Sequence, residues 1–231
     1  MLRQGSVLVC GLVASILCTC FIPAARGQAG GSTLCKRGYK YAGLQSATGT
    51  SGIRANLKIL AQPVVLTGHV AGWVGVGGPN AGPGGTAQWL QVGYFAFPDG
   101  SMQLYYEVEL PNSAPQYHVV KGRVTPGEAH LVSIREVSGH PGMWQIRVDG
   151  VPVGPAYFLA GSHGRYQPQG IGESWNPTAS ECNTYAWLFR GVEVAKGPGG
   201  SWVVAKSSHQ WHDAGYSLKL IPPDSFATVS R

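Results

Sequence analysis

The stretch from His69 to Leu110, HVAGWVGVGGPNAGPGGTAQWLQVGYFAFPDGSMQLYYEVEL, decides the fold of this chain. It contains three apolar runs rich in aromatic residues, separated by two segments rich in Gly and Pro. The runs have the length and residue types of β-strands, and the separating segments have those of turns. The stretch therefore predicts three consecutive strands.

Gln91 is a polar residue of the middle run, residues 87–97. Because side chains alternate along a strand, Gln91 shares one face with Trp89, Gly93 and Phe95. An amide among aromatic side chains is either a buried group satisfied by its neighbours or a polar group of a binding cleft. This alternative is the main functional question that the sequence raises.

The rest of the chain carries the same pattern of short strands and turns. No window shows a convincing helical period, and no internal repeat is present. Further strands are expected at residues 39–45, 53–59, 116–120, 129–136, 144–148, 151–153, 157–160, 169–175, 184–195, 201–205 and 216–221. About twelve short strands with regular turns predict an all-β fold, an antiparallel β-sandwich that forms one domain over residues 30–231.

Residues 1–29 have the features of a secretory signal peptide. Arg3 supplies the positive start, residues 7–22 are apolar, and small residues follow at 24–29. A lipoprotein anchor at Cys20 is the weaker interpretation of the same segment. No later segment is long and apolar enough to span a bilayer. The mature protein is therefore expected to be secreted, and a monomer is expected.

Removal of this segment leaves two of the five cysteines, Cys35 and Cys182. In an oxidising compartment two cysteines most simply form one disulfide, although pairing cannot be read from sequence alone. Two free thiols are the alternative.

The charge pattern argues against nucleic acid as a partner. The formal charge of +6 falls to +4 once Arg3 and Arg26 are removed, and the remaining basic residues are scattered singly. A nucleic-acid surface would show a clustered basic stripe. His209, His212 and Asp213 lie close together in the sequence, but a solvated tail explains them better than a metal site. No metal and no cofactor are expected.

The common hydrolase signatures are absent, which leaves the carboxylates as candidates for chemistry. Residues 161–164, GSHG, come nearest to a nucleophile elbow but lack its context. Glu107 and Glu109 share a strand face with Tyr105, and Glu173 shares one with Trp175. A carboxylate between apolar side chains loses hydration, which is a setting that recurs in general acids and bases.

Several segments, in order, resemble motifs of the glutamic peptidases, or eqolisins. The resemblance spans roughly residues 39–194, most of the mature chain. The matching segments are KYAG at 40–43, GWVGV at 72–76, LQVG at 90–93, LYYEV at 104–108 with Pro111, PGE at 126–128, and GESW at 172–175. This resemblance implies a bent, concanavalin A-like jelly-roll sandwich and a secreted acid endopeptidase.

The resemblance also implies a catalytic pair, Gln91 and Glu173. In the family, the Glu acts as general base on the attacking water and then as acid, and the Gln stabilises the oxyanion. The cleft around this pair would bind a polypeptide substrate through Trp73, Trp89, Tyr105, Glu107 and Trp175. The chain departs from the family after Glu173, where Ser-Trp-Asn-Pro follows, and in its basic composition.

Two other interpretations remain open at this point. The first is a non-catalytic, lectin-like sandwich that binds glycan or peptide on an aromatic concave face. The second is a β-sandwich glycosidase or lyase, in which Glu107 or Glu109 would face Glu173. All three interpretations share the sandwich fold.

Overall fold

A computed structural model describes residues 35–46, 49–178 and 182–230, and these fold into strands joined by short turns. The expected signal peptide lies outside the described residues. The strands are β1 (Gly38–Ser46), β2 (Gly52–Ile59), β3 (His69–Gly78), β4 (Gln88–Ala96), β5 (Met102–Glu109), β6 (Gln116–Lys121), β7 (Ala129–Glu136), β8 (Met143–Val148), β9 (Val151–Pro152), β10 (Tyr157–Phe158), β11 (Gln169–Asn176), β12 (Ala186–Ala195), β13 (Trp202–Val204), β14 (Ser207–His212), β15 (Tyr216–Ile221) and β16 (Ser225–Ser230). One 3-10 turn, η1 (Pro83–Gly85), interrupts the loop before β4.

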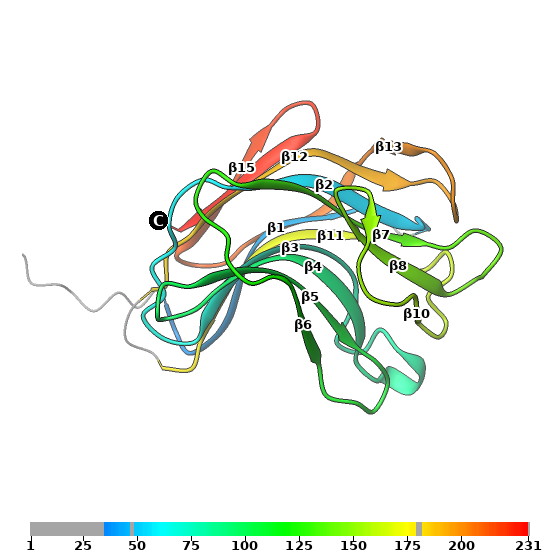
Figure 1. The fold of residues 1–231 in the computed structure, drawn as a ribbon, viewed down its shortest axis with the longest axis horizontal. Helices are drawn as coiled ribbons and strands as arrows, with labels where there is room; N and C mark the ends of the chain where they lie inside the picture. The colour runs from blue at the N-terminus through cyan, green and yellow to red at the C-terminus, as the bar shows by residue number, and fades with distance from the viewer. Residues whose placement is uncertain (1–34, 47–48, 179–181, 231) are drawn as a thin grey trace, which may run out of the picture. The chain divides into compact units, whose positions relative to one another are not determined.

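The strands form two antiparallel sheets that pack face to face. The seven-stranded sheet has the order β14-β1-β11-β3-β4-β5-β6. The nine-stranded sheet runs β10-β8-β7-β2-β12-β16-β15, with β9 and β13 pairing at its margins. Figure 1 shows the seven-stranded sheet arching under the other sheet, with its hollow side turned outward. The predicted antiparallel sandwich is confirmed.

Alternation along the strands divides core from surface. On β3, Val70, Val74 and Val76 belong to the main core between the sheets. On the other side of the same strand, Ala71 and Trp73 form a second small cluster with Tyr105. β3 is therefore buried on both faces, and its outward face forms part of a separate site.

Two strands were not predicted, β14 and β16. The solvated tail expected around His209 is wrong, because β14 is an edge strand that pairs with β1, and the Asp213 carboxylate accepts a hydrogen bond from the Tyr41 backbone N–H at 2.9 Å. In the part of the chain that the structure describes, no group of three His, Cys, Asp or Glu side chains is placed to hold a metal ion. The described residues also include no helix of the length and apolarity that crossing a membrane requires.

Cys35 and Cys182 form a disulfide, so the predicted pairing is confirmed. Cys35 stands just before β1 of the seven-stranded sheet, and Cys182 stands just before β12 of the nine-stranded sheet. The bond therefore ties the two sheets together at the ends of these strands. A disulfide is the bond that an oxidising compartment preserves.

Candidate active site

The outer face of the arched sheet holds a cleft of about 500 Å³. Its walls are mostly aromatic, and two carboxylates and two amides open into it. The lining side chains include Tyr39, Tyr41, His69, Trp73, Trp89, Gln91, Phe95, Glu107, Tyr117, Gln169, Ile171, Glu173 and Trp211. An apolar cleft with a few polar groups is the usual form of a ligand site.

Glu173 lies on β11 with its carboxylate buried in the floor of this cleft. One oxygen accepts a hydrogen bond from the Trp73 indole N–H at 3.1 Å. The other lies 3.1 Å from Nε2 of His69. Both partners come from β3, the neighbouring strand, so the carboxylate leans across the sheet toward β4.

Gln91 lies on β4 and leans toward the same part of the cleft. Its Nε2 donates a hydrogen bond to the Tyr105 hydroxyl at 2.9 Å. Tyr105 has no exposed surface, and its pKa is raised well above the usual value by burial and then by the charge of Glu173. An amide NH₂ carries two donors, so one N–H of Gln91 remains for a ligand.

The strand register fixes the distance between the Cα atoms of Gln91 and Glu173. Gln91 is paired with Gly75 of β3, and Glu173 is paired with Ala71 of the same strand. Four residues along β3 and two strand spacings separate their Cα atoms by about 16 Å, from ordinary sheet dimensions. The indole of Trp73 lies between them, since its N–H bonds Glu173 and its ring covers Gly75, the register partner of Gln91.

Glu107 is the second carboxylate of the cleft and the direct cross-strand neighbour of Gln91. Its Oε1 accepts a hydrogen bond from the Trp89 indole N–H at 3.1 Å. Burial raises the pKa of Glu107, the Trp89 hydrogen bond opposes that shift, and the charge of Glu173 adds to it. Glu109, the other carboxylate of this strand face, does not line the cleft.

Some of the other residues predicted to contact the substrate line the cleft, and others lie beside it or are buried under it. Trp73 and Trp89 line the cleft. Trp175 packs on Tyr39 with ring centroids 4.5 Å apart, beside the cleft but not lining it. Tyr105 is expected to contact the substrate, but it is fully buried. Its hydroxyl instead accepts the hydrogen bond from the Gln91 amide.

Sequence reasoning missed several residues of this site, among them the polar or edge-strand residues His69, Gln169 and Trp211. His69 had a signal, because it precedes Trp73 by four residues on a predicted strand and so shares its face. Gln169 had the same signal, because it precedes Glu173 by four residues on a predicted strand and so shares its face. In the sheet, Gly75 of β3 is paired with Gln169 on one side and with Gln91 on the other. Trp211 had none, since it comes from the edge strand β14, whose pairing with β1 is remote in sequence.

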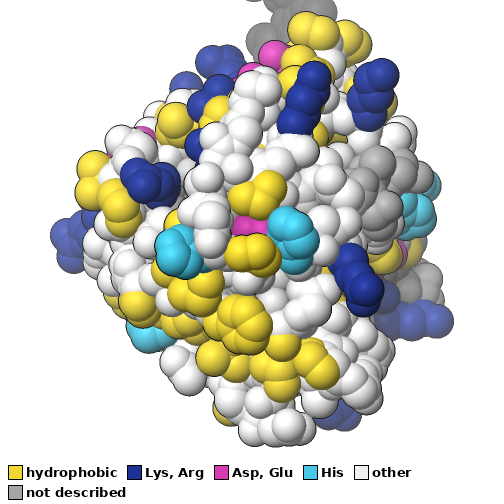
Figure 2. Space-filling model, turned by 90° about the vertical axis from the view of Figure 1, so that its right-hand side faces the viewer, with side chains coloured by type: hydrophobic (Ala, Val, Ile, Leu, Met, Phe, Trp, Pro, Cys, Tyr) yellow, Lys and Arg dark blue, Asp and Glu magenta, His cyan; other side chains and the backbone are white. Residues whose placement is uncertain are grey.

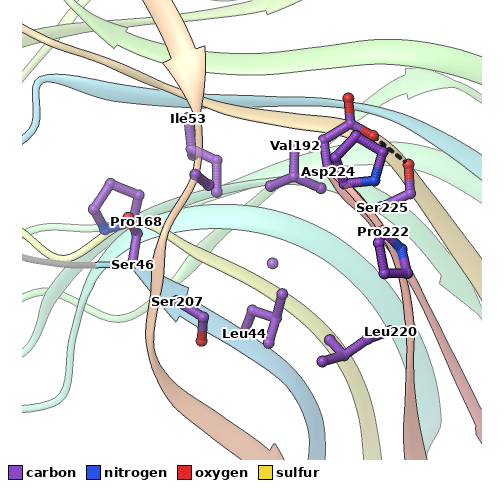
Figure 3. A pocket seen from close by; sticks show the side chains of 13 residues that line it. Leu44, Ser46, Ile53, Pro168, Val192, Ser207, Leu220, Pro222, Asp224 and Ser225 are labelled. Atoms are coloured by element: carbon purple, nitrogen blue, oxygen red, sulfur yellow. Dashed lines mark hydrogen bonds between the residues drawn. The ribbon is translucent and has the colours of Figure 1, made fainter.

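A separate apolar cavity of about 180 Å³ lies at an edge of the sandwich (Figure 3). Its walls include Leu44, Ile53, Val192 and Leu220, and the carboxylate of Asp224 at its rim accepts a hydrogen bond from Ser225. Its polar lining consists of serine hydroxyls and one carboxylate that is already bonded, with no histidine or second carboxylate among the lining residues. The outer cleft is therefore the better candidate for chemistry.

Solved structures share this fold over nearly their whole length. Scytalido-glutamic peptidase with a peptide-based transition-state analogue matches with a TM-score of 0.59 and 14% identity, covering 83% of this chain and 98% of that one. SCP-B, a member of the eqolisin family, in complex with the tripeptide Ala-Ile-His, matches with a TM-score of 0.53 and 13% identity, covering 84% and 98%. No family model and no curated protein sequence matches the chain. The chain thus has the bent antiparallel sandwich that the glutamic peptidases also have.

Proposed function

We propose that this protein is an endopeptidase of the glutamic type, with Glu173 as general base and then acid, and Gln91 as the oxyanion donor. The observation that supports it is that both side chains line one aromatic cleft, with the Trp73 indole bonded to Glu173 and the Gln91 amide held by Tyr105. The fold shared with peptidases whose solved structures hold a peptide-based transition-state analogue or a tripeptide supports the substrate class.

The proposed reaction places the scissile peptide over the Trp73 indole. The ionised Glu173 carboxylate takes a proton from a water molecule, and the water oxygen attacks the carbonyl carbon. The free N–H of Gln91 donates to the oxyanion that forms. Glu173 then gives its proton to the leaving nitrogen, the C–N bond breaks, and the carboxylate is restored.

The hydrogen bonds around Glu173 suit this role. The indole N–H of Trp73 donates to one oxygen of the carboxylate and holds it in place. His69 lies on the other oxygen and fixes the carboxylate's orientation. An oriented base is what a hydrolytic water needs, since misplacement of about 1 Å costs about 100-fold in rate.

The test is digestion of a denatured protein at pH values from acidic to neutral. We expect Gln91→Ala to lower cleavage about 100- to 1000-fold, as the loss of one oxyanion donor does elsewhere. Glu173→Gln should abolish cleavage, because an amide cannot accept the proton. The matched control is Glu193→Gln, which removes a carboxylate on the opposite sheet and should cleave like wild type. Cleavage that persists in both cleft variants would exclude the pair.

A non-catalytic binding protein is the second candidate, and one observation favours it. Both oxygens of Glu173 already have partners, and the amide of Gln91 is bonded to Tyr105. In this case Tyr39, Trp89 and Tyr117 would stack on glycan or on peptide side chains. Saturable binding of an oligosaccharide or peptide, without cleavage at any pH, would favour this candidate.

A further inference from the structure

The outer face of the nine-stranded sheet gathers basic side chains that are scattered in the sequence. Arg54 and Lys58 on β2, Arg135 on β7, Arg147 on β8 and Arg190 on β12 alternate with buried core residues, so they point away from the core. Figure 2 shows Lys and Arg side chains at the top of the molecule, the side on which the nine-stranded sheet lies in Figure 1, and also at its sides and lower edge. The strand alternation therefore places five basic side chains on one face of this sheet.

Three arginines of this face stand on adjoining strands. The register pairs Arg54 with Ser133 and Ser133 with Arg147, so these arginines flank β7 in one row. Arg135 follows Ser133 by two residues on the same face. From ordinary sheet dimensions, the three Cα atoms lie within about 10 Å of one another.

These side chains surround a pocket of about 390 Å³. The Trp202 ring forms one wall, with the guanidinium carbons of Arg54 and Arg135 at 4.8 and 5.3 Å from its centroid. Nε of Arg135 is buried and, among the described residues, has no hydrogen-bond partner. Gln145 and Ser133 also line the pocket, which adds neutral polar groups to its wall.

The charges around the pocket do not cancel. Arg54 is bonded to Glu193 at 2.6 Å. Glu136, the carboxylate among the lining residues, accepts a hydrogen bond from the Gly142 N–H on Oε1, which also lies 2.6 Å from the His163 ring, and its buried Oε2 has no partner among the described residues. Burial and then the charges of Arg147 and Arg54 lower the pKa of Arg135. Arg135 and Arg147 each donate to a backbone carbonyl, of Gly200 and Gly150 respectively. In the described part of the chain, neither is bonded to a carboxylate.

We propose that this pocket, defined by Arg54, Arg135, Arg147 and Trp202, binds a phosphate or sulfate group. Guanidinium groups recognise tetrahedral oxyanions through paired N–H donors, and an anion there would offset the repulsion among the three cations. The Nε–H of Arg135, which has no partner among the described residues, supplies one donor. The site lies on the sheet opposite the cleft and does not depend on the proposed peptidase function.

The test is calorimetric titration of the full chain with inorganic phosphate and with sulfate, at constant ionic strength. A sulfated oligosaccharide serves as a separate arm, which distinguishes a free ion from the same group carried on a polymer. We expect saturable binding in at least one arm, and about tenfold weaker binding in Arg147→Gln, from the loss of one charge-assisted pair of hydrogen bonds. Arg147→Lys, which keeps the charge but loses the planar fork, should bind with intermediate affinity.

Arg190→Gln is the matched control, since it removes the same charge from the same face outside the pocket. Its affinity should equal that of wild type. Equal weakening in Arg147→Gln and Arg190→Gln would show a diffuse charge effect and overturn the proposal. Absence of saturable binding in every arm would overturn it as well, and thermal unfolding of each variant confirms that it is folded.

Discussion

Glu107 and Glu173 lie in one cleft but in different surroundings. Glu173 has a partner on each oxygen, the Trp73 indole and His69. Glu107 has the Trp89 indole on one oxygen and a buried position that raises its pKa. Burial disfavours the ionised form of a carboxyl group, so the raised pKa of Glu107 means that it takes up a proton at a higher pH than an exposed carboxyl group does.

Glu107→Gln tests this at the level of stability. A carboxyl whose folded pKa is raised above its unfolded value of 4.5 costs stability when it is ionised. This loss of stability is complete above the pKa of the folded protein. It is absent below about 4.5, where the carboxyl group is protonated in both the folded and the unfolded protein. The variant should therefore melt at a higher temperature than wild type at pH 7 and at the same temperature at pH 4, because the Gln oxygen can keep the Trp89 hydrogen bond. An equal difference at both pH values would contradict the raised pKa.

The strand β3 connects the fold to the site through its glycines. A Cβ on Gly75 would lie 2.8 Å from Cζ3 of Trp73, so the indole lies flat over the glycine. This position brings the indole N–H to Glu173 at one end and leaves the Gln91 side of the cleft open at the other. The glycine is thus required by a close approach of a side chain.

Gly75→Ala should displace the Trp73 ring. Overpacking of this kind costs about 1 to 3 kcal/mol in the free energy of unfolding, and the shift should also weaken any activity or binding in the cleft. Urea unfolding measures the first effect, and cleavage or binding assays measure the second. Gly122→Ala is the matched control, because a Cβ there meets no atom within 4 Å. Wild-type behaviour of both variants would show that the ring is free to move.

At the scale of elements, strands with strong alternation could be predicted from the sequence and two others could not. The run around Gln91 alternates clearly and forms β4. The strand β16, SFATVS, reads as a polar segment after Pro222 and Pro223, yet Phe226 and Thr228 are buried by pairing with β12 and β15. β14 lies at a sheet edge, so its sequence carries little apolar pattern. Pairing between remote strands, which buries such segments, leaves no local signal.

At the scale of the whole molecule, the sequence could predict which faces of strands are polar but not which faces meet. The shared cleft of Gln91 and Glu173 rested on a resemblance, since eighty-two positions separate them in the sequence. The pocket of Arg54, Arg135 and Arg147 had no signal at all, because the three residues look scattered until β2, β7 and β8 pair. Sheet topology therefore supplies the information that the local pattern lacks.

The disulfide acts at this largest scale, because it joins the segments that lead into the two sheets. Cys35 and Cys182 are 147 residues apart, and in the chain-entropy model closure of such a loop stabilises by about 4 to 5 kcal/mol. We expect the double variant Cys35→Ser, Cys182→Ser to melt on the order of 10 °C lower than wild type, given the usual relation for a domain of this size. Wild type treated with a reducing agent should melt like the untreated double variant, and the same agent should leave the variant unchanged. An unchanged melting temperature of reduced wild type would show that the packing of the two sheets, and not the covalent bond, holds these segments together.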